Sequence, residues 1–143
     1  MNRRESFVVA AAGLATLAAA EAHAAEYNMH DETFDKCAKA HTDCQVHCDS
    51  CFRHCAEMIA NGDKVRAKTM HLCVDCAELC GAAAKLLARH SPLSAIACEA
   101  SAKACDDCAA ACEKFPTDKH MAECAKYCRD CAKAAREMIK HLA

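Results

Sequence analysis

The chain has 143 residues with 18 basic and 20 acidic side chains, which gives a formal net charge of −2. This length is enough for one domain, and the lack of a basic surplus argues against a nucleic-acid partner. Fifteen residues are cysteine and none is tryptophan. At this density, cysteine is the main guide to the class of protein.

The first 24 residues have the pattern of an export signal. Arg3 and Arg4 precede an apolar run at 8–20, and residues 22–24 form a small-x-small cleavage motif. The arginine pair resembles a twin-arginine signal, with an ordinary Sec signal as the alternative. The run is shorter than the roughly 20 residues of a membrane span. We therefore expect a signal peptide at 1–24, a periplasmic location and no membrane span.

After a segment without periodicity, expected to be a flexible arm at 25–30, the pattern predicts a long helix at 31–60. Asp31 can cap its start, and Asn61-Gly62 ends it, because glycine accepts a left-handed backbone. Apolar and thiol side chains recur at steps of three and four residues, which keeps them on one helix face. That face comprises Phe34, Cys37, His41, Cys44, Cys48, Cys51, Cys55 and Met58. A row of thiols therefore follows one side of this helix.

Three further helices repeat the pattern. The second follows Asp63, its predicted cap; the third starts at Ser91-Pro92, with proline at the first helical position; and Thr117 or Asp118 caps the fourth. Their corresponding faces carry Met70, Cys73, Cys76, Cys80 and Leu87; Cys98, Ser101, Cys105, Cys108, Cys112 and Phe115; and Met121, Cys124, Cys128, Cys131, Ala135, Met138 and Leu142.

Short connections make consecutive helices antiparallel, and each helix has one stripe to bury. The predicted fold class is therefore all-α. Residues 31–143 should form an antiparallel up-down-up-down four-helix bundle with a cysteine-lined core, which is the candidate metal-storage domain. No segment has the alternation of a β-strand.

Two explanations of the thiols do not involve metal. Buried cysteine packs as a small hydrophobe, but alanine, valine or leucine would stabilise the bundle without adding oxidisable groups. Disulfides suit an exported, cysteine-dense protein. However, an odd number of cysteines cannot pair completely, and cysteines three or four apart on one helix are poorly placed for the roughly 90° disulfide torsion. We therefore favour metal binding.

A continuous column of sulfur suits copper(I), a soft ion that accepts two or three ligands. If each ion binds two thiolates and each thiolate bridges two ions, the column is neutral and holds on the order of 15 ions. Such a capacity indicates storage, and since no catalytic constellation is visible we expect no enzyme. A zinc- or cadmium-sequestering protein of the metallothionein kind, an iron-sulfur protein and a single-ion copper chaperone remain as alternatives.

The two ends of the bundle differ in their predicted ligands. One end carries His54, Met58, Met70 and Met121, whose imidazole and thioether groups bind copper(I) more weakly than thiolates and can pass it on. We predict that copper enters and leaves there; the alternative is that methionine fills an irregular bundle end. At the other end, His41 is either a ligand or an oriented core histidine. The predicted metal ligands are the four residues at the first end and Cys37, Cys44, Cys48, Cys51, Cys55, Cys73, Cys76, Cys80, Cys98, Cys105, Cys108, Cys112, Cys124, Cys128 and Cys131.

The chain resembles the exported branch of the bacterial copper storage proteins. The resemblance covers the chain from about Asp31 onward. It rests on the four cysteine-striped helices, on Arg53-His54-Cys55 followed by Met58, and on the cysteines near the C-terminus, Cys124, Cys128 and Cys131.

What the resemblance implies is a four-helix bundle that binds many copper(I) ions along its core, with a histidine and several methionines at one end. It also implies assembly into a homo-oligomer, typically a tetramer. The protein would serve as a copper reserve for exported enzymes, with a copper-accepting enzyme or chaperone as partner. Cysteine number varies in the family, so the capacity of a relative does not carry over to this chain.

Overall fold

The computed structural model describes residues 31–143, and the predicted signal peptide at 1–24 and arm at 25–30 lie outside this part. The described chain contains four long helices: α2 (Glu32–Ala60), α3 (Ala67–Leu87), α4 (Ser94–Cys112) and α5 (Lys119–Leu142). A short 3-10 helix, η1 (Lys64–Arg66), precedes α3. Residues 31–143 contain no β-strand.

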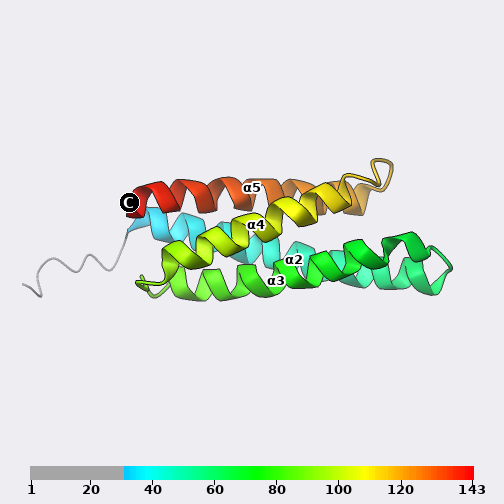
Figure 1. Ribbon diagram of the computed structural model, residues 1–143, viewed down its shortest axis with the longest axis horizontal. Helices are drawn as coiled ribbons and strands as arrows, with labels where there is room; N and C mark the ends of the chain where they lie inside the picture. The colour runs from blue at the N-terminus through cyan, green and yellow to red at the C-terminus, as the bar shows by residue number, and fades with distance from the viewer. Residues whose placement is uncertain (1–30) are drawn as a thin grey trace, which may run out of the picture. The chain divides into compact units, whose positions relative to one another are not determined.

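The four helices lie side by side as an antiparallel bundle (Figure 1). α2 packs against α3 and α5, and α4 packs against the same two helices. The diagonal pairs, α2 with α4 and α3 with α5, have no Cα atoms within 8 Å of each other. The diagonal helices therefore meet only through side chains on the bundle axis. The predicted all-α, up-down-up-down architecture is confirmed.

Two predicted helix signals act as expected. α2 ends before Asn61-Gly62, where Gly62 has a φ of +102°, a left-handed conformation that glycine adopts without a Cβ clash. At the start of α5, the Asp118 carboxylate accepts hydrogen bonds from the backbone N–H groups of His120, at 3.0 Å, and Met121, at 3.3 Å. These bonds satisfy two amides that have no partner within the helix.

Two other predicted caps are wrong. Asp63 makes no capping hydrogen bond to η1; its carboxylate instead accepts from Arg66 Nε at 2.7 Å, since an ion pair is available one turn away. Ser91 does not begin α4, which starts at Ser94. The Ser91 side chain accepts from the Leu93 N–H at 3.2 Å within a turn, so the helix begins two residues later than the proline suggested.

Small side chains fill most of the bundle core. All fifteen cysteines are buried, together with alanines such as Ala83, Ala109 and Ala132, which are at most 1 % exposed. The core divides into two clusters. One contains thirteen cysteines and is called the main column here; the other contains Cys37 and Cys98 with Phe34, Leu87 and Met138, and is called the far cluster.

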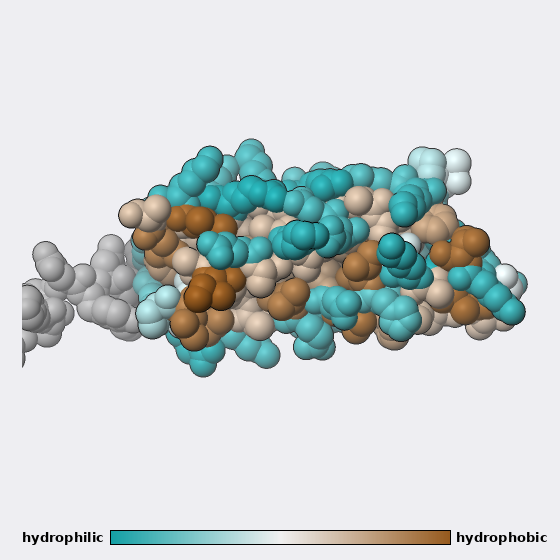
Figure 2. Space-filling view, in the orientation of Figure 1, coloured by the Kyte–Doolittle hydropathy of each residue, from teal (hydrophilic) through white to brown (hydrophobic). Residues whose placement is uncertain are grey.

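The face of the bundle that Figure 2 shows carries polar side chains interspersed with apolar ones. Val65, Leu93 and Ile96 are each more than half exposed. Within residues 31–143, none of the helices combines the length and the apolar character that crossing a membrane requires.

A polar network connects η1 to the start of α5 at the end of the bundle opposite the far cluster. The Arg66 guanidinium, whose side chain is 8 % exposed, donates to Asp118 Oδ2 at 2.7 Å and lies 4.4 Å from the centre of the Phe115 ring. His54 Nε2 donates to the same carboxylate oxygen at 2.8 Å. Burial raises the pKa of Asp118, but the hydrogen bonds from His54 and Arg66 together lower it by a larger amount. Its pKa therefore lies below the ordinary value.

Replacing this carboxylate should destabilise the bundle. In Asp118→Ala, α5 loses its cap and Arg66 loses one of its two carboxylate partners, so we expect the free energy of unfolding to fall by about 2–4 kcal/mol. Because the pKa of Asp118 is depressed, its contribution is present above the pKa of the unfolded state and is lost as the pH falls through the folded-state value. Urea unfolding of the reduced, metal-free protein at neutral and acidic pH would measure both effects.

Asp130→Ala is the matched control, because Asp130 pairs only along its own helix with Lys126 and is well exposed. Little change in stability is expected for this variant. Equal losses of stability in the two variants would show that the network around Asp118 does not stabilise the bundle more than an exposed ion pair does.

Candidate metal centre

The main column is built from every helix of the bundle. Each helix turns one cysteine stripe inward, because its cysteines are spaced three or four residues apart. The contributing residues are Cys44, Cys48, Cys51 and Cys55 from α2; Cys73, Cys76 and Cys80 from α3; Cys105, Cys108 and Cys112 from α4; and Cys124, Cys128 and Cys131 from α5. None of them is more than 1 % exposed.

Sulfur atoms from different helices lie close together along the column. The Sγ atoms of Cys48 and Cys128 are 3.5 Å apart, and Cys105 Sγ lies 3.5 Å from that of Cys80 and 3.6 Å from that of Cys76. An ion between two such sulfurs would need only small side-chain shifts to bind both. The helix packing therefore places thiols from separate helices around common points.

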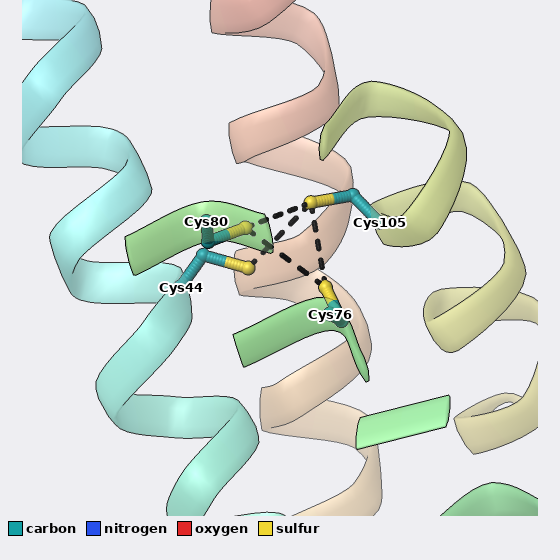
Figure 3. A group of neighbouring side chains, drawn as sticks. All are labelled: Cys44, Cys76, Cys80 and Cys105. Carbon is teal, nitrogen blue, oxygen red and sulfur yellow. Dashed lines mark hydrogen bonds between the residues drawn. The ribbon is translucent and has the colours of Figure 1, made fainter. Parts of the chain in front are cut away.

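Figure 3 shows one such point, where the sulfurs of Cys44, Cys76, Cys80 and Cys105 turn toward one another. These four Sγ atoms, from α2, α3 and α4, all lie within 4.8 Å of one another. Cys44 and Cys76 belong to a second group of four as well, together with Cys48 and Cys128. Neighbouring groups share thiols. A shared thiol is placed to bridge two ions, so the groups do not form separate metal sites.

The same geometry disfavours disulfides between diagonal helices. The Sγ atoms of Cys44 and Cys105 are 3.7 Å apart, although α2 and α4 have no Cα atoms within 8 Å. A disulfide requires Cα atoms within about 7 Å. Such pairs can both reach one ion, but they cannot form a bond to each other unless the helices move.

Hydrogen bonding among the thiols lowers the pKa of some cysteines and raises the pKa of others. Bonds with Cys105 and Cys128 lower the pKa of Cys44 despite burial, whereas bonds with Cys105, Cys108 and Cys124, together with burial, raise that of Cys128. The bond with Cys51, assisted by burial, raises the pKa of Cys55 to about 12. Cys55 is therefore a neutral thiol near pH 7 in the metal-free protein.

At one end, methionines continue the column. Met121 is fully buried, and its Sδ lies 3.4 Å from Cys51 Sγ and 3.8 Å from Cys55 Sγ. Met70 is half-buried and packs against the main column, and Met58 is half-buried at the end of α2. Met121 thus lies directly against two thiols, and Met70 packs beside the column.

His54 is placed differently from these methionines. Its Nε2 donates to Asp118, and its ring stacks on that of His120 with the centroids 4.7 Å apart. His120 in turn lies 3.3 Å from Ser50 Oγ. The imidazole is therefore part of the polar network that covers this end. Arg66 also belongs to the network, and no sequence signal pointed to it, because nothing in the local spacing connects it to Asp118, 52 residues away.

At the far cluster, His41 is fully buried and its ring has fixed partners. Nε2 lies 2.8 Å from Ser101 Oγ, and Nδ1 lies 2.8 Å from the Cys37 carbonyl oxygen and 3.6 Å from Cys37 Sγ. The ligand atoms of Cys37, His41 and Cys98 all lie within 4.8 Å of one another. The hydrogen bond with Cys98, together with burial, raises the pKa of Cys37, and the same bond lowers that of Cys98.

The fold and these thiols define a cysteine-lined helical bundle of the metal-binding class. Residues 29–140 match the model of the Csp family, copper storage protein, and the chain belongs to this family. A search of curated proteins found no match.

Solved structures agree with the family. The Cu(I)-bound copper storage protein BsCsp3 is 30% identical with a TM-score of 0.70, over 75% of this chain and 98% of that chain. The copper storage protein Ccsp from Streptomyces lividans, loaded with 10 copper equivalents, is 25% identical with a TM-score of 0.71, over 80% and 89% of the two chains. The cargo of this protein is therefore copper(I), with several ions per monomer.

The predicted periplasmic location is wrong. One similar structure, 26% identical with a TM-score of 0.69 over 76% of this chain and 93% of that chain, is a cytosolic copper storage protein from Streptomyces lividans with five coppers. The export prediction rested on the composition of residues 1–24, which lie outside the described residues. Basic residues before an alanine-rich run are a pattern of composition, and this pattern is not unique to export signals.

Copper(I) binding should strengthen as the pH rises. Thiols must lose their protons to become ligands, and Cys55, with a pKa of about 12, is protonated at neutral pH. If one proton leaves for each ion, the affinity increases about tenfold per pH unit. Chelator competition between about pH 6 and pH 8, together with indicator-dye measurement of released protons, would test this. Binding without proton release would contradict it.

Proposed function

We propose that residues 31–143 form a storage domain that holds copper(I) on its fifteen cysteine thiolates and releases it to other proteins as a reserve. The observation that carries this proposal is the overlap of the four-cysteine groups, in which Cys44 and Cys76 serve two groups at once. A thiolate that serves two groups can bridge two ions. Bridging along the column allows many ions in a small core.

Charge favours copper(I) as the ion of such a chain. Two bridging thiolates per ion, each shared by two ions, give one negative charge for each copper(I). The column then stays neutral, and a buried neutral column avoids the large cost of burying isolated charges. Zinc needs about four ligands in each structural site. Separate tetrahedral sites could not all form where Cys44, Cys48, Cys124 and Cys128 are each shared between groups.

Anaerobic titration of the reduced protein with copper(I), against a competing copper(I) chelator, tests the proposal. We expect tight uptake of ten or more ions per monomer, because the main column offers thirteen thiols. Saturation after one or two ions would contradict storage on the column. A parallel titration with zinc(II) is the control for unspecific thiolate binding, and it should saturate at far fewer ions.

We propose further that His54, Met58, Met70 and Met121 form the end through which copper enters and leaves. The contact of Met121 Sδ with both Cys51 and Cys55 supports this, because it joins a thioether directly to the last thiols of the column. Thioethers bind copper(I) but hold it less tightly than thiolates do. An ion could therefore pass from Met121 to Cys51 by ligand exchange.

Removing the soft ligands at this end should slow copper exchange. The combined variant Met58→Leu, Met70→Leu, Met121→Leu and His54→Gln keeps side-chain volume and retains an N–H donor for Asp118. We expect stopped-flow loading to slow several-fold while final capacity stays nearly unchanged. Met138→Leu, in the far cluster, is the matched control for losing a buried methionine. Unchanged loading rates in the combined variant would show that this end is not the route.

We also propose that the bundles assemble into a homo-oligomer, typically a tetramer in this family. Membership of the copper storage protein family supports this. The partners are then copper ions, further copies of the chain, and a copper-accepting enzyme or chaperone. Because the periplasmic prediction is wrong, exported enzymes are not retained as the recipients.

A further inference from the structure

The stripe of thiols has a gap before it reaches the far cluster. Moving from Cys44 along α2, the next inward residue is His41; moving from Cys105 along α4, it is Ser101. Both residues are fully buried. Alanines, including Ala83 and Ala135, fill the corresponding layer on α3 and α5. Cys37 and Cys98 therefore lie beyond a layer without sulfur, apart from the thirteen cysteines of the main column.

The buried imidazole in this layer is held as metal-binding histidines are held in proteins. Ser101 Oγ donates its proton to the Cys98 carbonyl oxygen at 3.2 Å, so it can accept from His41 Nε2–H at 2.8 Å. Nδ1 then lies 2.8 Å from the Cys37 carbonyl oxygen and 3.6 Å from Cys37 Sγ, and it must turn from the oxygen toward the sulfur to bind an ion. A hydrogen bond at one ring nitrogen that orients the other toward the metal is the usual support of a histidine ligand.

The far cluster also has its own approach from the surface. A pocket of about 140 Å³ between α2 and α5 is lined by Cys37, Ala134, Glu137 and Met138, among others. Cys37 is 3 % exposed, whereas Cys44 at the near end of the main column is fully buried. An ion can therefore reach Cys37 without passing through the methionine-lined end.

We propose that Cys37, His41 Nδ1 and Cys98 form a separate site for one copper(I) ion, independent of the main column. The inference rests on the proposed copper storage. Two thiolates and a neutral imidazole hold the ion in a complex with one net negative charge, beside Phe34, Leu87 and Met138. Binding releases both thiol protons. No further thiols adjoin this pair, so the two cysteines together hold one ion. The main column, in contrast, holds about one ion for each cysteine.

Paired substitutions separate this site from the column. Cys37→Ala with Cys98→Ala should lower copper(I) capacity by one ion per monomer, measured by anaerobic titration against a chelator. The control Cys76→Ala with Cys80→Ala removes two thiols from the main column and should lower capacity by about two ions. A loss of two ions in the first variant would place Cys37 and Cys98 in the column, and no loss would show that they do not bind copper; either result overturns the inference.

A second variant keeps all the thiols and tests the imidazole. His41→Gln should weaken the binding of one ion and remove a nitrogen ligand from the X-ray absorption spectrum of the loaded protein, while the other ions stay unchanged. An unchanged spectrum and affinity would contradict ligation by His41. If the wild-type protein itself binds only one or two ions, the storage proposal fails instead, so the two failures are distinguishable.

Discussion

The structure depends on the meeting of four cysteine stripes along one axis. Cysteine is short, so its sulfur reaches the bundle axis while the backbones of diagonal helices stay more than 8 Å apart. Sulfurs such as those of Cys44 and Cys105 then lie 3.7 Å apart without the backbone approach that a disulfide requires. The core is consequently rich in thiols that can share ions and are poorly placed to crosslink diagonally. Larger side chains would fill this space and remove the ligands.

The two ends of this core are closed by different chemistry, which bears on how copper moves. At one end, Met121 extends the sulfurs toward a polar network in which Asp118 joins His54 and Arg66. That network is polar and partly exposed, with 25 % of the His54 side chain and 16 % of the Asp118 side chain accessible, so a charged ion meets less cost there than in an apolar layer. At the other end, Phe34, Leu87 and Met138 seal the axis, and a pocket between α2 and α5 reaches Cys37 from the side.

Local signals predicted much of this arrangement, and they failed where a distant partner competed. The glycine at 62 and the Asp118 cap were identified correctly, because each depends on its own backbone. Asp63 was not a cap, because Arg66 offers its carboxylate a stronger, charged partner. The export prediction failed because composition alone carried it. The role of Arg66 had no sequence signal, since its contact with Asp118 joins segments 52 residues apart.

The sequence by itself determined the class of fold and the chemistry of its interior. Steps of three and four residues put every cysteine on an inward helix face, and soft sulfur ligands select copper(I). Only the tertiary structure decided which thiols lie close enough to share an ion and where the column stops. Those properties depend on the axial register of neighbouring helices, which places His41 beside Ser101 and separates Cys37 and Cys98 from the remaining thiols. Periodicity within a helix fixes a face, whereas register between helices is set by how all four faces pack together.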